Sequence, residues 1–156
     1  MKKKIVFIMN PISGTSSKAA VPSLIDSTLD KEQFEYEIKM TERPGHASEL
    51  AAEARDNHAD IVVAVGGDGT VNEVARSLVH SDSALGILPC GSGNGLARHL
   101  LLPMNLKKSI EIINACKIHD LDYGVINEYP FFCTCGMGFD AFVSMKFAES
   151  GKRGPI

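Results

Sequence analysis

The segment that most constrains the fold is an apolar run at residues 61–65 that leads directly into Gly-Gly-Asp-Gly-Thr at 66–70. A short continuous apolar run predicts a strand buried on both faces, as found in parallel sheets. After this corner, apolar residues recur at the helical spacing i, i+3, i+4 and i+7, at Val71, Val74, Ala75 and Leu78. The sequence therefore predicts a buried strand, a glycine-rich corner and a helix.

The corner has the composition of a phosphate-handling loop. Because Gly66, Gly67 and Gly69 have no side chains, their N–H groups and the helix N-terminus can face a polyphosphate. Asp68 is acidic, so its expected partner is a bound Mg²⁺ or a reacting hydroxyl. The alternative is a plain structural turn, because Asp-Gly also favours a β-hairpin. A hairpin needs a second alternating strand, and residues 71–79 do not alternate.

Strand and helix patterns alternate over most of the chain. Predicted strands cover residues 4–9, 34–40, 61–65 and 84–88. Predicted helices cover 21–29, 47–54, 70–79, a segment from 91–94 toward 101, and 106–113. This alternation predicts right-handed βαβ crossovers and an α/β fold, a parallel sheet with helices on both faces. Ligands of such sheets bind beyond the carboxyl ends of the strands, which is where the glycine-rich loops fall.

The pattern changes after residue 117. Two strands are predicted at 118–126 and 130–136 with no helix between them, followed by a helix at 138–149. We therefore expect an α/β domain over 1–117 and the beginning of a second, β-rich domain over 118–156.

Composition narrows the possible partners. The chain has 156 residues and a net charge of −3, so nucleic acid is not expected as a partner. A basic cluster at residues 2–4 only weakly suggests attraction to an anionic membrane. No apolar run is long enough for a transmembrane segment or a signal peptide. The four cysteines lack metal-site spacing and are expected to be buried, reduced thiols of a cytoplasmic protein.

Three further loops accompany the glycine-rich corner. The first, residues 10–17, has small hydroxyl residues that can cap a helix or bind phosphate oxygens. The second begins at Thr41, and the third is Pro-Cys-Gly-Ser-Gly-Asn-Gly at 89–95. The third is not a dinucleotide fingerprint, because Leu96 stands where G-x-G-x-x-G needs glycine. A Walker A loop is excluded as well, because no Ser or Thr follows Gly151-Lys152.

Five motifs occur in a fixed order along the chain. They are Asn-Pro-x-Ser-Gly at 10–14, Thr-x-x-x-Gly-His-Ala at 41–47, Gly-Gly-Asp-Gly-Thr-x-Asn-Glu-Val at 66–74, Leu-Pro-x-Gly-Ser-Gly-Asn at 88–94 and Gly-Phe-Asp-Ala at 138–141. Together they resemble the catalytic region of the diacylglycerol kinase and sphingosine kinase superfamily. The resemblance covers essentially the whole chain.

The resemblance implies a three-layer nucleotide-binding domain of the phosphofructokinase and NAD-kinase type, followed by a β-rich domain. It also implies ATP and Mg²⁺ as cofactors, with Asp68 handling Mg²⁺ or activating the acceptor hydroxyl. The residues expected to contact the nucleotide are Asn10, Pro11, Ile12, Ser13, Gly14, Thr41, Gly67, Asp68, Gly69, Thr70, Val71, Asn72, Glu73 and Ser92.

Two departures from the family pattern bear on the function. Gly-Ser-Gly-Asn-Gly-Leu-Ala at 91–97 is closer to sphingosine and ceramide kinases than to bacterial diacylglycerol kinases. The Asp-Gly-Glu of the C-terminal domain, which supplies a catalytic carboxylate and a second metal site, does not occur. We therefore expect an N-terminal part of a kinase, inactive alone.

The expected reaction is ATP-dependent phosphorylation of a lipid hydroxyl, diacylglycerol or a sphingoid type, by a cytoplasmic enzyme that associates peripherally with a membrane. Two alternatives stay open from the sequence. One is an NAD or sugar-phosphate kinase, and the other is a non-catalytic nucleotide-binding regulatory module. The sequence also leaves open whether the chain forms a homodimer.

Overall fold

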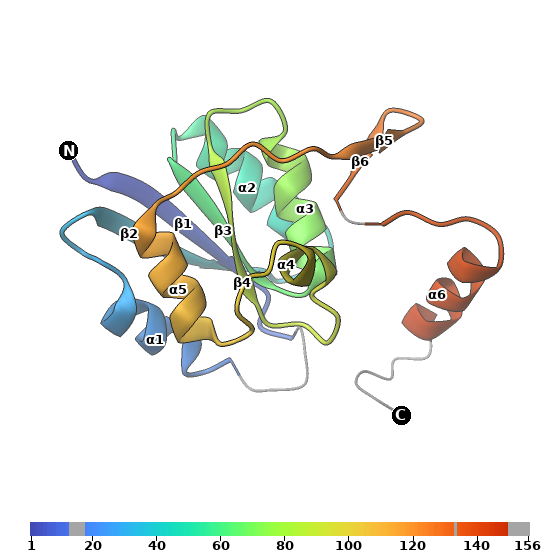
Figure 1. The fold of residues 1–156 in the computed structure, drawn as a ribbon, viewed down its shortest axis with the longest axis horizontal. Helices are drawn as coiled ribbons and strands as arrows, with labels where there is room; N and C mark the ends of the chain where they lie inside the picture. Colours follow the sequence, from blue (N-terminus) through green and yellow to red (C-terminus); the bar gives the residue numbers. More distant parts are fainter. Residues whose placement is uncertain (13–17, 133, 150–156) are drawn as a thin grey trace.

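The centre of the fold is a four-stranded parallel sheet in the order β2-β1-β3-β4 (Figure 1). The computed structural model describes residues 1–12, 18–132 and 134–149. The strands are β1 (Lys3–Met9), β2 (Phe34–Met40), β3 (Ile61–Gly66) and β4 (Ala84–Pro89). β1 pairs with both β2 and β3, so β1 and β3 occupy the middle of the sheet. The predicted parallel α/β sheet is confirmed.

Helices cover both faces of this sheet and make three layers (Figure 1). The helices α1 (Val21–Thr28) and α5 (Leu106–Ala115) pack on one face. The helices α2 (His46–Asp56), α3 (Asp68–Leu78) and α4 (Gly95–His99) pack on the other. Successive side chains of a strand point to opposite faces of the sheet, so one strand contributes side chains to the hydrophobic cores on both faces.

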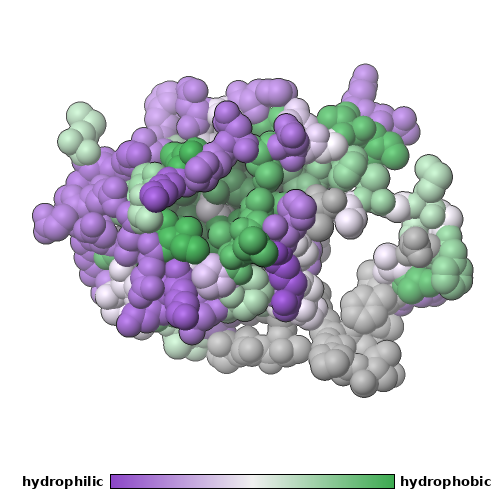
Figure 2. All heavy atoms as spheres, viewed as in Figure 1, coloured by the Kyte–Doolittle hydropathy of each residue, from purple (hydrophilic) through white to green (hydrophobic). Residues whose placement is uncertain are grey.

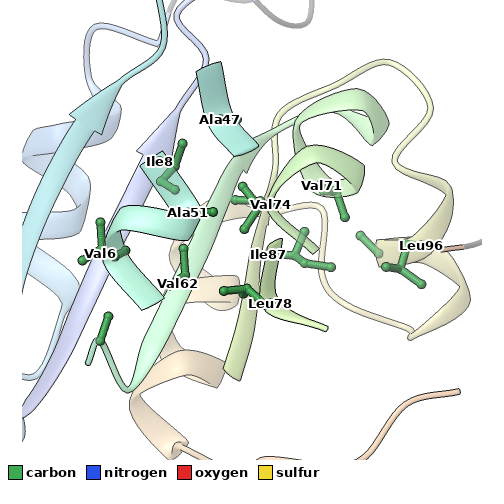
Figure 3. Packing of buried hydrophobic residues seen from close by; sticks show 14 residues of the cluster. Val6, Ile8, Ala47, Ala51, Val62, Val71, Val74, Leu78, Ile87 and Leu96 are labelled. Carbon is green, nitrogen blue, oxygen red and sulfur yellow. The ribbon is translucent and has the colours of Figure 1, made fainter. Parts of the chain in front are cut away.

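The central strands show why a continuous apolar run was needed. Val6 and Ile8 of β1 pack with α2 and α3, whereas Ile5, Phe7 and Met9 pack with α1 and α5. The first of these two cores is drawn in Figure 3, where side chains of β1, β3 and β4 meet those of α2, α3 and α4. The edge strand β2 has one covered face, because Phe34, Tyr36 and Ile38 pack in the core beside α1 and α5 while Glu35 and Glu37 are exposed. This difference between its two faces explains its alternating polar sequence.

Two helix boundaries differ from the prediction. α3 begins at Asp68, not at Thr70, so the Asp-Gly pair belongs to the first helical turn and not to a hairpin. α4 has only five residues and ends at His99, because Leu101 adopts a left-handed conformation with φ of 57°. The predicted extension of this helix toward residue 101 is therefore wrong.

The C-terminal strands are shorter than predicted. β5 (Gly124–Ile126) and β6 (Tyr129–Phe131) form an antiparallel hairpin. Asn127 and Glu128 make its two-residue turn with φ values of 46° and 69°, the positive φ that such turns require. Tyr129 is therefore paired with Ile126 and belongs to the strand, not to the connection.

The hairpin is attached to the end of α3. The Tyr123 hydroxyl lies 3.0 Å from His80 Nε2, and Arg76 Nε donates to the carbonyl of Pro130 at 3.3 Å. The final helix α6 (Phe139–Glu149) lies apart from the sheet (Figure 1). None of the helices in the described part of the chain has the length and apolar character needed to cross a membrane.

The cysteines correct one expectation. Cys90 and Cys116 are half-buried free thiols, but Cys135 is exposed, so the prediction of uniformly buried thiols is wrong. Burial raises the pKa of the Cys90 thiol, and the nearby charge of Lys18 opposes this only in part. Cys133 lies outside the described residues.

Candidate functional site

A cleft of about 620 Å³ lies at the carboxyl edge of the sheet. It is lined by residues from the loops that follow all four strands of the sheet. The lining residues are Asn10, Pro11, Ile12, Thr41, Glu42, Arg43, Pro44, Ala47, Gly67, Asp68, Gly69, Thr70, Glu73, Gly91, Ser92 and Gly93. In the sheet, β2 lies on one side of β1 and β3 lies on the other side, so the direction of the strand order reverses at β1. Crevices at such switch points are the usual ligand sites of open α/β sheets.

Asn10 sets the path of the chain as it leaves β1. Its backbone N–H donates to Val65 O at 3.1 Å, and its side-chain Oδ1 accepts from the N–H of Ile12 at 3.0 Å. Lys18 is a buried residue, only 7% exposed, and its ammonium group donates to the Asn10 carbonyl at 2.7 Å. These bonds fix the first wall of the cleft beside the end of β3.

Asp68 ties two loops of the cleft together. Its Oδ2 accepts from the backbone N–H of Asn94 at 2.9 Å, and its Oδ1 accepts from the N–H of Gly95 at 2.6 Å. A Cβ at Gly93 would lie 2.6 Å from Oδ2, so the carboxylate can approach only because residue 93 is glycine. Each carboxylate oxygen keeps a further lone pair for a metal ion or a hydroxyl.

Glycine also allows the loops after β3 and β4 to touch. Gly67 and Gly91 approach so closely that a Cβ on Gly91 would collide with the Cα of Gly67. The loop containing Gly91 is held by Asn94, whose side chain accepts from the Gly91 N–H at 2.8 Å and donates to the Gly91 carbonyl at 2.7 Å. Two glycine-rich segments that are distant in sequence thus form one backbone-lined wall.

Glu73 joins α3 to the start of α2. Its Oε1 accepts from the N–H of Gly45 at 3.1 Å, and its Oε2 accepts from the N–H of Ala47 at 3.2 Å. These N–H groups at the N-terminus of α2 have no partner within the helix, and the N-cap residue Gly45 has no side chain to supply one. Glu73 therefore acts as a cap provided from another helix, and it fixes the loop that carries Thr41.

We expect Glu73→Gln to lower the free energy of unfolding by about 1 kcal/mol, because hydrogen bonds to a charged acceptor are worth more than neutral ones. The amide can accept from one of the two N–H groups, but its own NH₂ then faces the other. Chemical denaturation of the variant checks this. Glu111→Gln, at an exposed position of α5, is the control and should change stability by less than about 0.5 kcal/mol. Equal denaturation midpoints for Glu73→Gln and the wild type would contradict the capping role.

The structure brings most of the predicted site residues into one cleft. Asn10, Pro11, Ile12, Thr41, Gly67, Asp68, Gly69, Thr70, Glu73 and Ser92 all line it. Val71 is only 6% exposed and packs in the core, so its side chain does not reach the cleft. Asn72 is half-buried and does not line the cleft either. Ser13 and Gly14 lie outside the described residues.

Sequence reasoning missed two cations of this region. Lys18 carries no motif signal, and only its bond to the Asn10 carbonyl places it beside the cleft. Arg43 lines the cleft, and its two terminal guanidinium nitrogens donate to the carboxylate of Glu49 at 2.8 and 2.6 Å. This hydrogen-bonded pair lowers the pKa of the Glu49 carboxyl. The position of Arg43 in the sequence could have identified it. It follows Thr41 by two residues, and that loop was predicted to lie at the carboxyl edge of the sheet, where ligands bind.

Comparison with known protein families gives one match that covers most of the chain. The family described as "Diacylglycerol kinase catalytic domain" matches residues 4–126, which include the four strands of the sheet except for Lys3 at the start of β1. These residues also contain every described residue that lines the cleft.

Two curated relatives agree with this match. The chain is 34% identical over 134 residues to a diacylglycerol kinase of Staphylococcus saprophyticus, which covers 84% of this chain and 44% of the relative. It is 33% identical over 134 residues to a diacylglycerol kinase of Staphylococcus haemolyticus, covering 84% and 40% respectively. The chain thus spans less than half the length of these relatives.

A solved structure supports the fold alone. The crystal structure of a diacylglycerol kinase from Bacillus anthracis superimposes with a TM-score of 0.71 at 24% identity. The superposition covers 83% of this chain and 48% of that chain.

Proposed function

This chain belongs to the diacylglycerol kinase catalytic domain family, and from this premise we propose that it is the nucleotide-binding part of an ATP-dependent lipid kinase. The single observation that carries the proposal is the cleft. The loops that follow all four strands line it, and they bring Asp68 together with the backbone of the glycine-rich loops. Residues 118–156 are proposed to begin the C-terminal domain of the same kinase. The match covers only 44% and 40% of these two relatives, which supports this division.

The residues of the cleft fit a nucleotide with its metal ion. Gly69 and the N-terminus of α3 present an open backbone, which suits phosphate oxygens. Among residues 1–12, 18–132 and 134–149, no three metal-binding side chains are clustered. A Mg²⁺ ion held by Asp68 would therefore take its other ligands from phosphate and water, the arrangement usual for this ion. Bound Mg²⁺ would neutralise charge on the transferred phosphoryl group.

The acceptor is proposed to be a hydroxyl group of a lipid, diacylglycerol or a sphingoid base. The names of the relatives support the first, and the Gly-Ser-Gly-Asn-Gly-Leu-Ala segment at 91–97 keeps the second open. In either case the chain's own contribution is positioning. Asp68 is held in place by two backbone N–H groups, so its carboxylate is oriented before any substrate binds.

Calorimetric titration of the chain with Mg-ATP, and separately with NAD, tests the nucleotide site. We expect saturable binding of Mg-ATP and no binding of NAD. Circular dichroism on the same sample shows that the chain is folded. A folded chain that binds NAD and not ATP would contradict the proposal and favour a kinase with a soluble acceptor.

Gly69→Ala separates stability from nucleotide binding. A Cβ at Gly69 meets no atom within 4 Å and lies in the first turn of α3. Alanine should therefore stabilise the helix by about 0.5–1 kcal/mol. The same methyl group stands on the lining of the cleft, where it would hold phosphate away from the backbone, so we expect Mg-ATP affinity to fall about tenfold or more, a loss of about 1.4 kcal/mol. Denaturation and calorimetry measure the two effects, and unchanged affinity would argue against phosphate at this corner.

A further inference from the structure

An exposed apolar loop separates α4 from α5. It comprises residues 100–104, Leu-Leu-Leu-Pro-Met. Leu101 is 89% exposed, and Leu100 and Met104 are each 36% exposed. Figure 2 shows hydrophobic surface in the part of the view where Figure 1 places α4 and the connection to α5. Apolar residues that gather on a surface often mark a binding site.

The backbone of this loop would favour glycine where leucine stands. The N–H of Leu102 donates to Ala97 O at 2.8 Å, and the N–H of Leu101 donates to Arg98 O at 3.0 Å. These two bonds form the Schellman ending of a helix, in which the left-handed position is usually glycine. Leu101 occupies that position with φ of 57° and buries almost none of its side chain. It therefore contributes little to folding, and strained residues of this kind concentrate at functional sites.

The loop adjoins the proposed catalytic cleft. Met104 Sδ lies 3.8 Å from Asn94 Nδ2, within hydrogen-bonding range for sulfur. The backbone N–H of Asn94 is in turn bound to Asp68 Oδ2. One residue thus connects the apolar loop to the carboxylate at which the reaction is proposed to occur. A membrane surface at this loop would lie beside the active site.

The charged residues that adjoin the loop in the sequence are all positive. Arg98 precedes it, and Lys107 and Lys108 follow it, each exposed. Residues 93–110 contain no aspartate or glutamate. No carboxylate of the described residues lies within ion-pair distance of these three cations. Apolar residues flanked by basic ones match the interface of a bilayer with anionic headgroups.

We propose that residues 100–104 dock this chain on an anionic lipid bilayer, with Leu101 inserted among the lipids. The inference rests on the proposed lipid kinase function, because an enzyme that acts on a membrane lipid has to meet the bilayer. It assigns the contact to this loop and not to the basic cluster at residues 2–4. Lys3 and Lys4 lie at the amino end of β1, opposite the edge that carries the cleft, and bind Cys116 Sγ and Asn57 O through their ammonium groups.

The test compares Leu101→Gly with His58→Gly in the same chain. His58 occupies the equivalent position at the end of α2, with φ of 55° and the same pair of backbone bonds, from His58 N to Arg55 O and from Ala59 N to Ala54 O. Both variants relieve the same backbone strain, so both should keep or raise the thermal midpoint. Only Leu101→Gly removes an apolar side chain from the proposed interface.

Sedimentation with vesicles measures docking. With vesicles of phosphatidylcholine and phosphatidylglycerol in equal parts, we expect the wild type and His58→Gly to bind alike. Leu101→Gly should bind about tenfold more weakly, as the loss of one buried apolar side chain implies. Pure phosphatidylcholine vesicles should bind all three proteins more weakly, because the basic flanks then have no anionic partner.

Several results would overturn the proposal. One is equal vesicle binding by Leu101→Gly and the wild type, and another is no vesicle binding by the wild type. A third is a shift of the oligomeric state by Leu101→Gly without vesicles, which would assign the loop to contact with a second copy of the chain. Calorimetry with Mg-ATP on the same samples distinguishes a failure of the docking proposal from a failure of the proposed function. Vesicle binding that depends on Leu101 in a chain that binds no ATP would leave the docking loop standing and count against the nucleotide site.

Discussion

Replacing Asp68 by asparagine is expected to reduce the rate of phosphoryl transfer by at least about 100-fold, the usual cost of removing one preorganised electrostatic group from an active site. The variant has almost the same shape, but it lacks the charge that would hold Mg²⁺ or activate the acceptor hydroxyl. Its NH₂ group would also face the N–H of Asn94 or Gly95, where the wild type has an acceptor. Transfer of labelled phosphate from ATP to diacylglycerol and to sphingosine, by a protein that joins this chain to the second half of a kinase, measures the loss.

The Asp68 experiment needs a control for folding. Ser92→Ala changes another residue of the same cleft wall without removing a charge, and it should alter the rate far less. The thermal midpoints of both variants show whether the loops after β3 and β4 remain joined. Turnover by Asp68→Asn at the wild-type rate, from a folded protein, would refute the catalytic role of this carboxylate.

Gly91→Ala is expected to lower the free energy of unfolding by about 1–3 kcal/mol, the usual cost of adding a methyl group where there is no room. The new Cβ would collide with the backbone of Gly67, which cannot turn aside as a flexible side chain can. The loops after β3 and β4 would have to separate, and the N–H bond from Cys90 to the Gly66 carbonyl, 2.8 Å long, would be strained. Chemical denaturation and Mg-ATP calorimetry measure the loss of stability and of affinity together.

Gly69→Ala serves as the matched control for Gly91→Ala, because it adds the same methyl group to the same cleft where there is open space. The two variants should therefore change stability in opposite directions. If Gly91→Ala were as stable as the wild type, the close approach of the two loops would not be a requirement of the fold.

The sequence by itself determined the secondary structure of the α/β part. The strand patterns at 34–40 and 61–65 were strong because hydrophobic periodicity reports burial directly. The glycine-rich loops could also be assigned to one edge of the sheet, because parallel strands bring all their carboxyl ends to the same side. Periodicity failed at residues 118–123 and at the end of α4. An apolar residue is compatible there with several conformations, and a short strand needs a partner strand to form.

Only the tertiary structure decided what the polar side chains of the cleft do. Asp68 binds backbone N–H groups 26 and 27 residues away, and Glu73 caps a helix that begins before it in the chain. Val71 belongs to the same motif at 66–74 as Asp68 and Glu73. Its side chain nevertheless faces the core, because the turn of α3 points it toward the sheet. Sequence motifs identify residue types and local geometry. Hydrogen-bond partners depend on which loops the packing of the sheet and helices brings within about 3 Å of each other.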